Sequence, residues 1–198
     1  MKLPIKIQLD YSSLLIPIML CTEGYWGDVL ILLLAAAIHE CGHLAVARWL
    51  HIPIRSLHIS VLGARLQLED PLLSYRREWL LCAAGPLFSG SGALIAVLLA
   101  PFFPYPALAE RFAGISLTLG IINLLPIGWL DGGRMFRVAC YQFLPMPTVR
   151  VLVRTVSFLF FLLLWMTSTY LLLRAGNSLS LFVFSFSLFL RFFLLEPD

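Results

Sequence analysis

Long runs of apolar residues dominate the chain, and short segments between them carry most of its charge. A helix that crosses a bilayer needs about 20 mostly apolar residues. Six segments satisfy or approach this length and are predicted to be membrane-spanning helices: Tyr11–Tyr25, Val29–Leu50, Trp79–Phe103, Phe112–Leu130, Thr155–Leu173 and Ser178–Leu195. The pattern therefore predicts an all-α polytopic membrane protein with about six transmembrane helices and both termini on the same side.

A different pattern fills the segment between the second and third predicted spans. Apolar residues alternate with polar ones from Leu57 to Val61, and the alternation resumes after Gly63 as far as Leu68. Period-two patterning on both sides of a glycine is typical of a β-hairpin. An open strand edge cannot face lipid, because its backbone groups would lack hydrogen-bond partners. The hairpin is therefore expected at the membrane interface, or re-entrant beside a water-filled cavity.

The composition supports a lipid environment. Hydrophobic residues make up 60% of the 198 residues and charged residues 13%, whereas a soluble domain carries about 25% charged residues. A water-soluble fold of this size could not bury so much apolar surface. No basic run interleaved with aromatic residues indicates nucleic acid binding, and no composition shift divides the chain. We expect one membrane domain over residues 1–198, with lipid as its main solvent.

The basic residues predict the orientation of the chain. With both termini on the cytoplasmic side, all of the 14 Lys and Arg residues except Arg111 and Arg174 fall on that side of the six-span arrangement. Cytoplasmic loops of membrane proteins carry an excess of such residues. The termini are therefore predicted to be cytoplasmic.

The second predicted span contains the sequence His39-Glu40-Cys41-Gly42-His43, an H-E-x-x-H pattern. On a helix, residues four apart share a face, so His39 and His43 can bind one metal ion while Glu40 lies beside a bound water. Two packed or pore-lining histidines are the alternative interpretation. Ionisable residues within a span are costly and usually functional, which favours the metal site.

A catalytic zinc normally takes three protein ligands and leaves the fourth position to water. Asp131, at the end of the fourth predicted span, is the candidate for the third ligand. Pro126 and the glycines at 132 and 133 interrupt the helix around it, which allows the carboxylate to turn inward. Alternatively, Asp131 caps the following helix, but two histidines that need a partner favour the ligand.

HECGH on an early helix, followed by NLLPIGWLDGGR near the end of a later one, resembles the site-2 protease family of intramembrane zinc metalloproteases. Within that family the likeness is to the short bacterial branch typified by the stage IV sporulation protein FB. It extends to the hairpin and to Ala84-Gly85-Pro86 at the start of the third span. PDZ and CBS domains, which occur in many members, are not expected in residues 1–198.

The resemblance implies a set of roles. One Zn²⁺ per chain would be held by His39, His43 and Asp131, with Glu40 as the general base. Asn123 would contact the substrate backbone or the oxyanion, and the region around Gly63 would engage the substrate. One departure is that Ser89 stands near the position where many members have an asparagine after Gly-Pro.

The resemblance also implies a setting. The substrate would be a membrane-associated protein, such as a pro-sigma factor or a regulator released by regulated intramembrane proteolysis during sporulation, and membrane proteins would regulate or inhibit the enzyme. The location would be the bacterial cell membrane or the forespore membrane.

Two other functions use some of the same residues. A metal-binding membrane transporter would need further polar residues along a path, and the spans offer few. A non-proteolytic membrane scaffold would not need Glu40.

Overall fold

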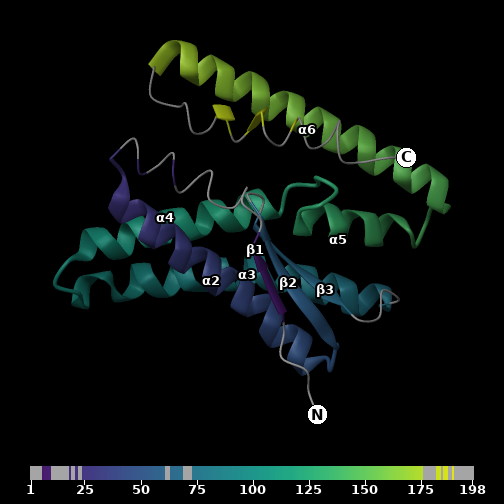
Figure 1. Cartoon of the computed structure of the whole chain (residues 1–198), viewed down its shortest axis with the longest axis horizontal. Helices are drawn as coiled ribbons and strands as arrows, with labels where there is room; N and C mark the ends of the chain where they lie inside the picture. The colour runs from purple at the N-terminus through teal and green to yellow at the C-terminus, as the bar shows by residue number, and fades with distance from the viewer. Residues whose placement is uncertain are drawn as a thin grey trace.

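The structure is a computed structural model, and it describes residues 6–9, 18, 21, 24–60, 63–68, 73–175, 182, 183, 185, 186 and 189. Within these ranges the chain is mostly helical (Figure 1). The five longer helices are α2 (Trp26–Trp49), α3 (Tyr75–Leu99), α4 (Pro106–Asn123), α5 (Asp131–Cys140) and α6 (Met146–Ala175). A short 3-10 turn, Ala100–Phe102, joins α3 to α4.

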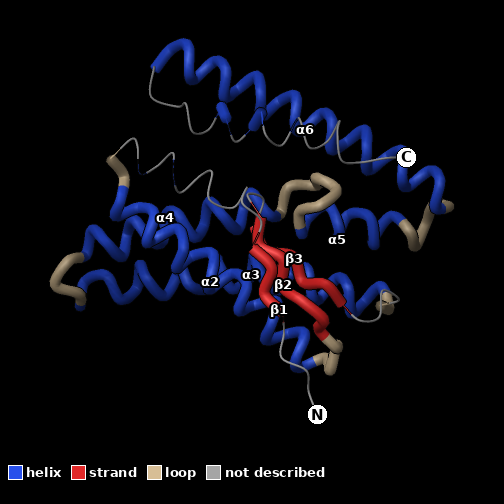
Figure 2. The backbone as a smooth tube through the Cα atoms, in the orientation of Figure 1, coloured by secondary structure: helices blue, strands red, loops and turns tan. Residues whose placement is uncertain are grey.

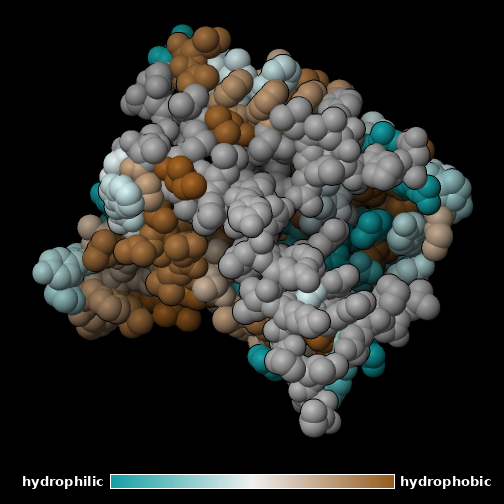
Figure 3. Space-filling view, in the orientation of Figure 1, coloured by the Kyte–Doolittle hydropathy of each residue, from teal (hydrophilic) through white to brown (hydrophobic). Residues whose placement is uncertain are grey.

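Three helices of the described part are long and apolar enough to cross a membrane. They cover Trp26–Trp49, Tyr75–Phe102 and Met146–Arg174, and they correspond to the second, third and fifth predicted spans. Their outward side chains are apolar too, because large residues such as Leu30 and Leu163 are exposed. Figure 3 shows hydrophobic side chains gathered over the part of the surface formed by α2, α3 and α4. Such surfaces suit lipid rather than water.

The bounds of the fourth predicted span were wrong. The helix in that region, α4, begins at Pro106 and ends at Asn123, and residues 124–130 form a loop. Pro126 explains the early end, since the residue before a proline is biased away from helical geometry. The first and last predicted spans, Tyr11–Tyr25 and Ser178–Leu195, lie largely outside the described residues.

The end of α2 turns the chain out of the helix and into the sheet. His51 has a φ of 55°, in the left-handed region, where a chain commonly leaves a helix. Pro53 follows, and a proline cannot continue the helical hydrogen bonds. The chain then enters β2 (Ile54–Ser60), which pairs antiparallel with β3 (Gly63–Leu68).

The paired strands lie where the sequence predicts a hairpin. The structure adds a strand that was not predicted: β1 (Lys6–Leu9) pairs parallel with β2 and completes a sheet of order β1-β2-β3 (Figure 2). A strand of four residues carries almost no periodic signal, and its pairing with residues some fifty positions away is set by tertiary structure.

The helices α2, α3 and α4 pack against one another, and α5 packs on α3. A small cluster of Ile127, Leu130 and Phe161 joins the loop before α5 to α6. There the backbone N–H of Gly128 donates to the Ser157 hydroxyl at 2.9 Å. The loop that leads to Asp131 is therefore supported by a helix on its other side.

We expect Phe161→Ala to lower the free energy of unfolding by about 3–5 kcal/mol, because it leaves a cavity between α6 and the loop. Phe161 is 1% exposed. The measurement is thermal and denaturant unfolding of the detergent-solubilised chain. Leu163→Ala is the control, since Leu163 is 61% exposed on the same helix; equal destabilisation by the two variants would contradict the assigned packing.

Candidate metal centre

The structure brings together His39, His43 and Asp131. Nε2 of His39 lies 3.2 Å from Oδ2 of Asp131, and Nε2 of His43 lies 3.1 Å from the same oxygen. The two Nε2 atoms are 3.3 Å apart. One ligand atom from each residue therefore faces a common point, and all three lie within 4.8 Å of one another. This is the arrangement predicted from HECGH and the distant aspartate.

Helix α2 supplies both imidazoles on one buried face. His39 and His43 are separated by one helical turn, so their side chains project side by side. Their exposed fractions are 3% and 7%. Two buried imidazoles and a carboxylate would be costly without polar partners. Here the three side chains contact one another.

Each histidine makes a second hydrogen bond through Nδ1, and both partners come from α3. His39 Nδ1 lies 2.9 Å from the Ser89 hydroxyl, and His43 Nδ1 lies 2.8 Å from the Leu81 carbonyl oxygen. With Nδ1 of each ring in contact with one of these oxygens, Nε2 is the ring atom that faces Asp131. Metal-binding histidines are usually oriented in this way.

Gly85 lets α3 approach the two imidazoles. A Cβ at this position would overlap Nε2 of both His39 and His43. A second close approach occurs at Gly42, where a Cβ would lie 2.6 Å from the Ala84 carbonyl oxygen. A side chain at position 85 would displace the imidazoles, and one at position 42 would push α2 and α3 apart.

Asp131 is the first residue of α5, and two glycines set its position. A Cβ at Gly132 would overlap the backbone of Leu124, and one at Gly133 would overlap the backbone of Ile127. The start of α5 therefore lies directly against the loop that follows α4. Asp131 begins α5 but does not cap it, because the N-cap is Leu130 and no side-chain cap hydrogen bond forms there. Its carboxylate faces the two histidines instead.

The environment of Asp131 affects its protonation. Burial by itself would raise the pKa of the carboxyl, but hydrogen bonds and charge interactions with His39 and His43 outweigh burial and hold the pKa below its usual range. The carboxylate therefore stays ionised at neutral pH, the form in which it ligates a cation.

The other predicted site residues are Glu40, Asn123 and Gly63, and they lie outside the three-residue cluster. Glu40 is half-buried on α2, next to His39 in the chain. The amide nitrogen of Asn123 donates to the Leu119 carbonyl at 2.9 Å, within α4. Gly63 is the first residue of β3 and pairs with Ser60. The substrate-binding roles of Asn123 and Gly63 stay predictions.

Two residues of the site were not assigned by sequence reasoning. Ser89 was noted only as a departure from the family pattern, and Gly85 as part of the Ala84-Gly85-Pro86 segment. Their spacing offers a signal that could have found them: Leu81, Gly85 and Ser89 recur every four residues and so lie along one stripe of α3. Their contact with the histidines depends on how α3 is rotated toward α2, which spacing alone does not give.

Comparisons with known proteins agree with this site. The profile of Peptidase family M50 matches residues 105–164, a range that contains Asn123 and Asp131. The chain is 31% identical over 146 residues to the stage IV sporulation protein FB of Bacillus subtilis, covering 71% of this chain and 50% of that protein. It is 26% identical over 147 residues to a zinc metalloprotease of Methanocaldococcus jannaschii, covering 69% of this chain and 42% of that protein.

A putative zinc metalloprotease, Rip3 of Mycobacterium tuberculosis, is 30% identical over 129 residues, which is 60% of this chain and 33% of that protein. The chain thus spans half or less of the length of these relatives.

Among solved structures, the site-2 protease from Methanocaldococcus jannaschii has a similar fold. Its TM-score is 0.69 at 20% sequence identity, over 97% of this chain and 93% of that chain. The fold, the profile and the relatives agree with one another. Residues 105–164 match Peptidase family M50, and the chain is similar in fold to a site-2 protease.

Proposed function

We propose that this chain is an intramembrane zinc metalloprotease that hydrolyses peptide bonds of membrane-associated proteins. The observation that carries the proposal is the convergence of His39, His43 and Asp131 inside a bundle of apolar helices. Glu40 lies beside them on the same helix, as a general base requires.

The residues of the site fit zinc. Two imidazole nitrogens and one carboxylate oxygen are a common ligand set for catalytic zinc, which keeps a further position open. Ser89 and the Leu81 carbonyl already orient the two rings. A zinc ion held by these three ligands would supply Lewis acidity toward water and toward a peptide carbonyl.

Glu40 supplies the proton transfers. Its carboxylate accepts a proton from the attacking water while the water oxygen bonds to the carbonyl carbon. The same group then donates that proton to the amide nitrogen as the C–N bond breaks, which yields a carboxylate and an amine. Asn123 supports the oxyanion once its amide turns away from Leu119. An unchanged turnover of Asn123→Ala would exclude that role.

The substrates belong to the membrane. The relatives include a sporulation protein, which supports cleavage of a membrane-associated precursor such as a pro-sigma factor, or release of a regulator. Six spans with cytoplasmic termini would place the arginines at the start of α3, in α5 and near the start of α6 on the cytoplasmic side. Membrane proteins that regulate the enzyme would act in the same bilayer.

The sheet is our candidate for substrate engagement. A helical substrate must become extended before it can be cut, and its freed backbone groups in lipid cost several kcal/mol each. In the sheet order β1-β2-β3, the outer edge of β3 is the one not used by β2. We infer that the hairpin is re-entrant and that β3, which begins at Gly63, adds an extended substrate as a further strand.

Replacement of Glu40 tests catalysis separately from metal binding. We expect Glu40→Gln to keep one zinc per chain and to lose turnover by about 10²–10⁴-fold or more. The measurement combines metal analysis of the purified chain with cleavage of a single-span substrate in liposomes. Glu110→Gln changes an exposed glutamate on α4 and is the matched control. Wild-type turnover in Glu40→Gln would refute the proposed role.

The close approach of α3 gives a second prediction. Gly85→Ala should displace both imidazoles and remove most of the bound zinc, because its methyl group overlaps both Nε2 atoms. Gly90→Ala, on the same helix, meets nothing within 4 Å and should retain the metal. Zinc content per chain is the measurement, and full occupancy in Gly85→Ala would show that the helices are not arranged in this way.

The edge-strand hypothesis is tested through the backbone. Gln67→Pro removes a backbone N–H from β3 and should lower cleavage at least about tenfold, because a substrate strand loses a partner. Gln67→Ala changes only the side chain and should cleave normally. Cleavage is measured with zinc content as the check on the metal site. Equal activity of the two variants would argue against strand addition.

A further inference from the structure

An ion pair joins α5 to α3 close to the metal centre. An Nη2–H of Arg134 donates to Oε1 of Glu78 at 3.4 Å, and Nη2 of Arg137 lies 3.9 Å from the same oxygen. Arg134 follows Asp131 by one helical turn, and Glu78 precedes Leu81 by the same interval. The pair therefore connects the helix that provides the carboxylate ligand to the helix that orients the imidazoles.

The apolar packing of α5 is sparse. Its fully buried residues are Gly132, Gly133 and Val138, so a single buried apolar side chain comes from this helix. The glycines hold its first turn against the loop after α4. Beyond that turn, Val138 is the only fully buried apolar side chain of α5, and polar contacts with α3 add to it.

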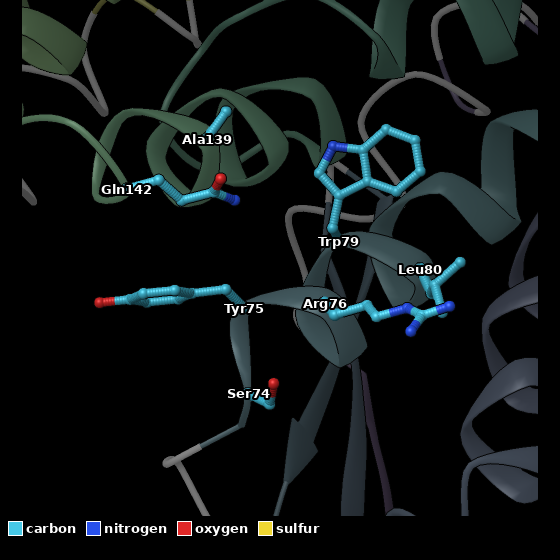
Figure 4. Close-up of a pocket in the computed structure, with 7 residues that line it drawn as sticks. All are labelled: Ser74, Tyr75, Arg76, Trp79, Leu80, Ala139 and Gln142. Atoms are coloured by element: carbon cyan, nitrogen blue, oxygen red, sulfur yellow. The ribbon is translucent and has the colours of Figure 1, made fainter.

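A cavity separates the two helices beside the ion pair. It has a volume of about 550 Å³ and lies between the start of α3 and the end of α5. Figure 4 shows Tyr75 and Trp79 of α3 facing Ala139 and Gln142 across the open space. The rings of Tyr75 and Tyr141 stack at this end with their centroids 6.2 Å apart, and the open hollow lies beside them, so the packing between the two helices is incomplete there.

The ion pair is sheltered compared with another interhelical pair. The side chains of Arg134 and Glu78 are 19% and 21% exposed. In the pair of Arg111 with Asp28, which joins α4 to α2, the arginine is 66% exposed. Exposed pairs contribute little because water screens them, whereas a shared and partly buried carboxylate is screened less.

We propose that Glu78, held by Arg134 and Arg137, is a positioning residue that fixes α5 on α3 and so keeps Asp131 at the ligand position. Glu78 continues the stripe of α3 that includes Leu81, Gly85 and Ser89, so one face of one helix orients all three ligands. This inference rests on the proposed metal site.

The test is the zinc affinity of the full chain in nanodiscs, measured by competition with a chromophoric chelator. Cobalt(II) is bound in parallel, because its visible spectrum reports the number and geometry of the ligands. Glu78→Gln should raise the zinc Kd about tenfold, the lower end of the effect of lost supporting contacts at metal sites. It should also shift the cobalt spectrum toward that of Asp131→Asn.

Matched variants distinguish positioning from general stability. Asp28→Asn removes the exposed pair and should leave the zinc Kd unchanged within about twofold. Ser89→Ala, which removes the bond to His39, is the positive control for loss of support. Exchange of the charges in Glu78→Arg with Arg134→Glu should restore most of the affinity.

The outcomes separate this inference from the metal site itself. A wild-type chain that binds no zinc, or an Asp131→Asn chain that binds it equally well, would overturn the site and the inference together. Normal binding by wild type with an unchanged Kd and spectrum in Glu78→Gln would overturn the positioning role alone. Should Glu78→Gln not fold, Arg134→Gln removes the same bond and the same result is required of it.

Discussion

The close contact between α2 and α3 is the constraint on which the rest of the site depends. The side chains of His39, His43 and Asp131 lie in the interior of an apolar bundle, where each would be costly without a polar partner. Gly85 removes the side chain that would keep α3 away from the imidazoles, and Gly42 does the same on α2. Small residues at contacts between membrane helices permit this approach. Here the approach also brings the Leu81 carbonyl and the Ser89 hydroxyl within hydrogen-bonding distance of the rings.

The division of labour among the helices follows from this contact. Helix α2 contributes the two imidazoles and Glu40, and α3 contributes their orientation. Asp131 comes from a separate short helix, because the glycines at 132 and 133 allow α5 to begin directly against the preceding loop. A site assembled from three segments distant in the chain is preserved only if their relative positions are fixed. Hydrogen bonds hold the imidazoles of α2 on α3. Close backbone contacts hold the start of α5 on the preceding loop, and an ion pair joins α5 to α3.

The sequence predicted those parts of the site that depend on local geometry. His39 and His43 were identifiable because a fixed spacing on one helix forces them together, and Asp131 because a break in the helix and a family resemblance coincided there. Gly85 and Ser89 were not assigned, since their roles depend on the rotation of α3 about its axis. The end of α4 at Asn123 was placed too late because apolar residues continue to Leu130, although Pro126 prevents the helix from including them. The strand β1 was missed because its partner lies far away in the chain.

Phe161 and Ser157 connect the loop after α4 to α6. That loop ends at Asp131, and it rests on α6, a helix of thirty residues whose outward face is apolar. The position of the Asp131 carboxylate is thus linked to a long helix that contributes no side chain to the His39, His43 and Asp131 cluster. A change in the tilt of α6 would reach Asp131 through that loop.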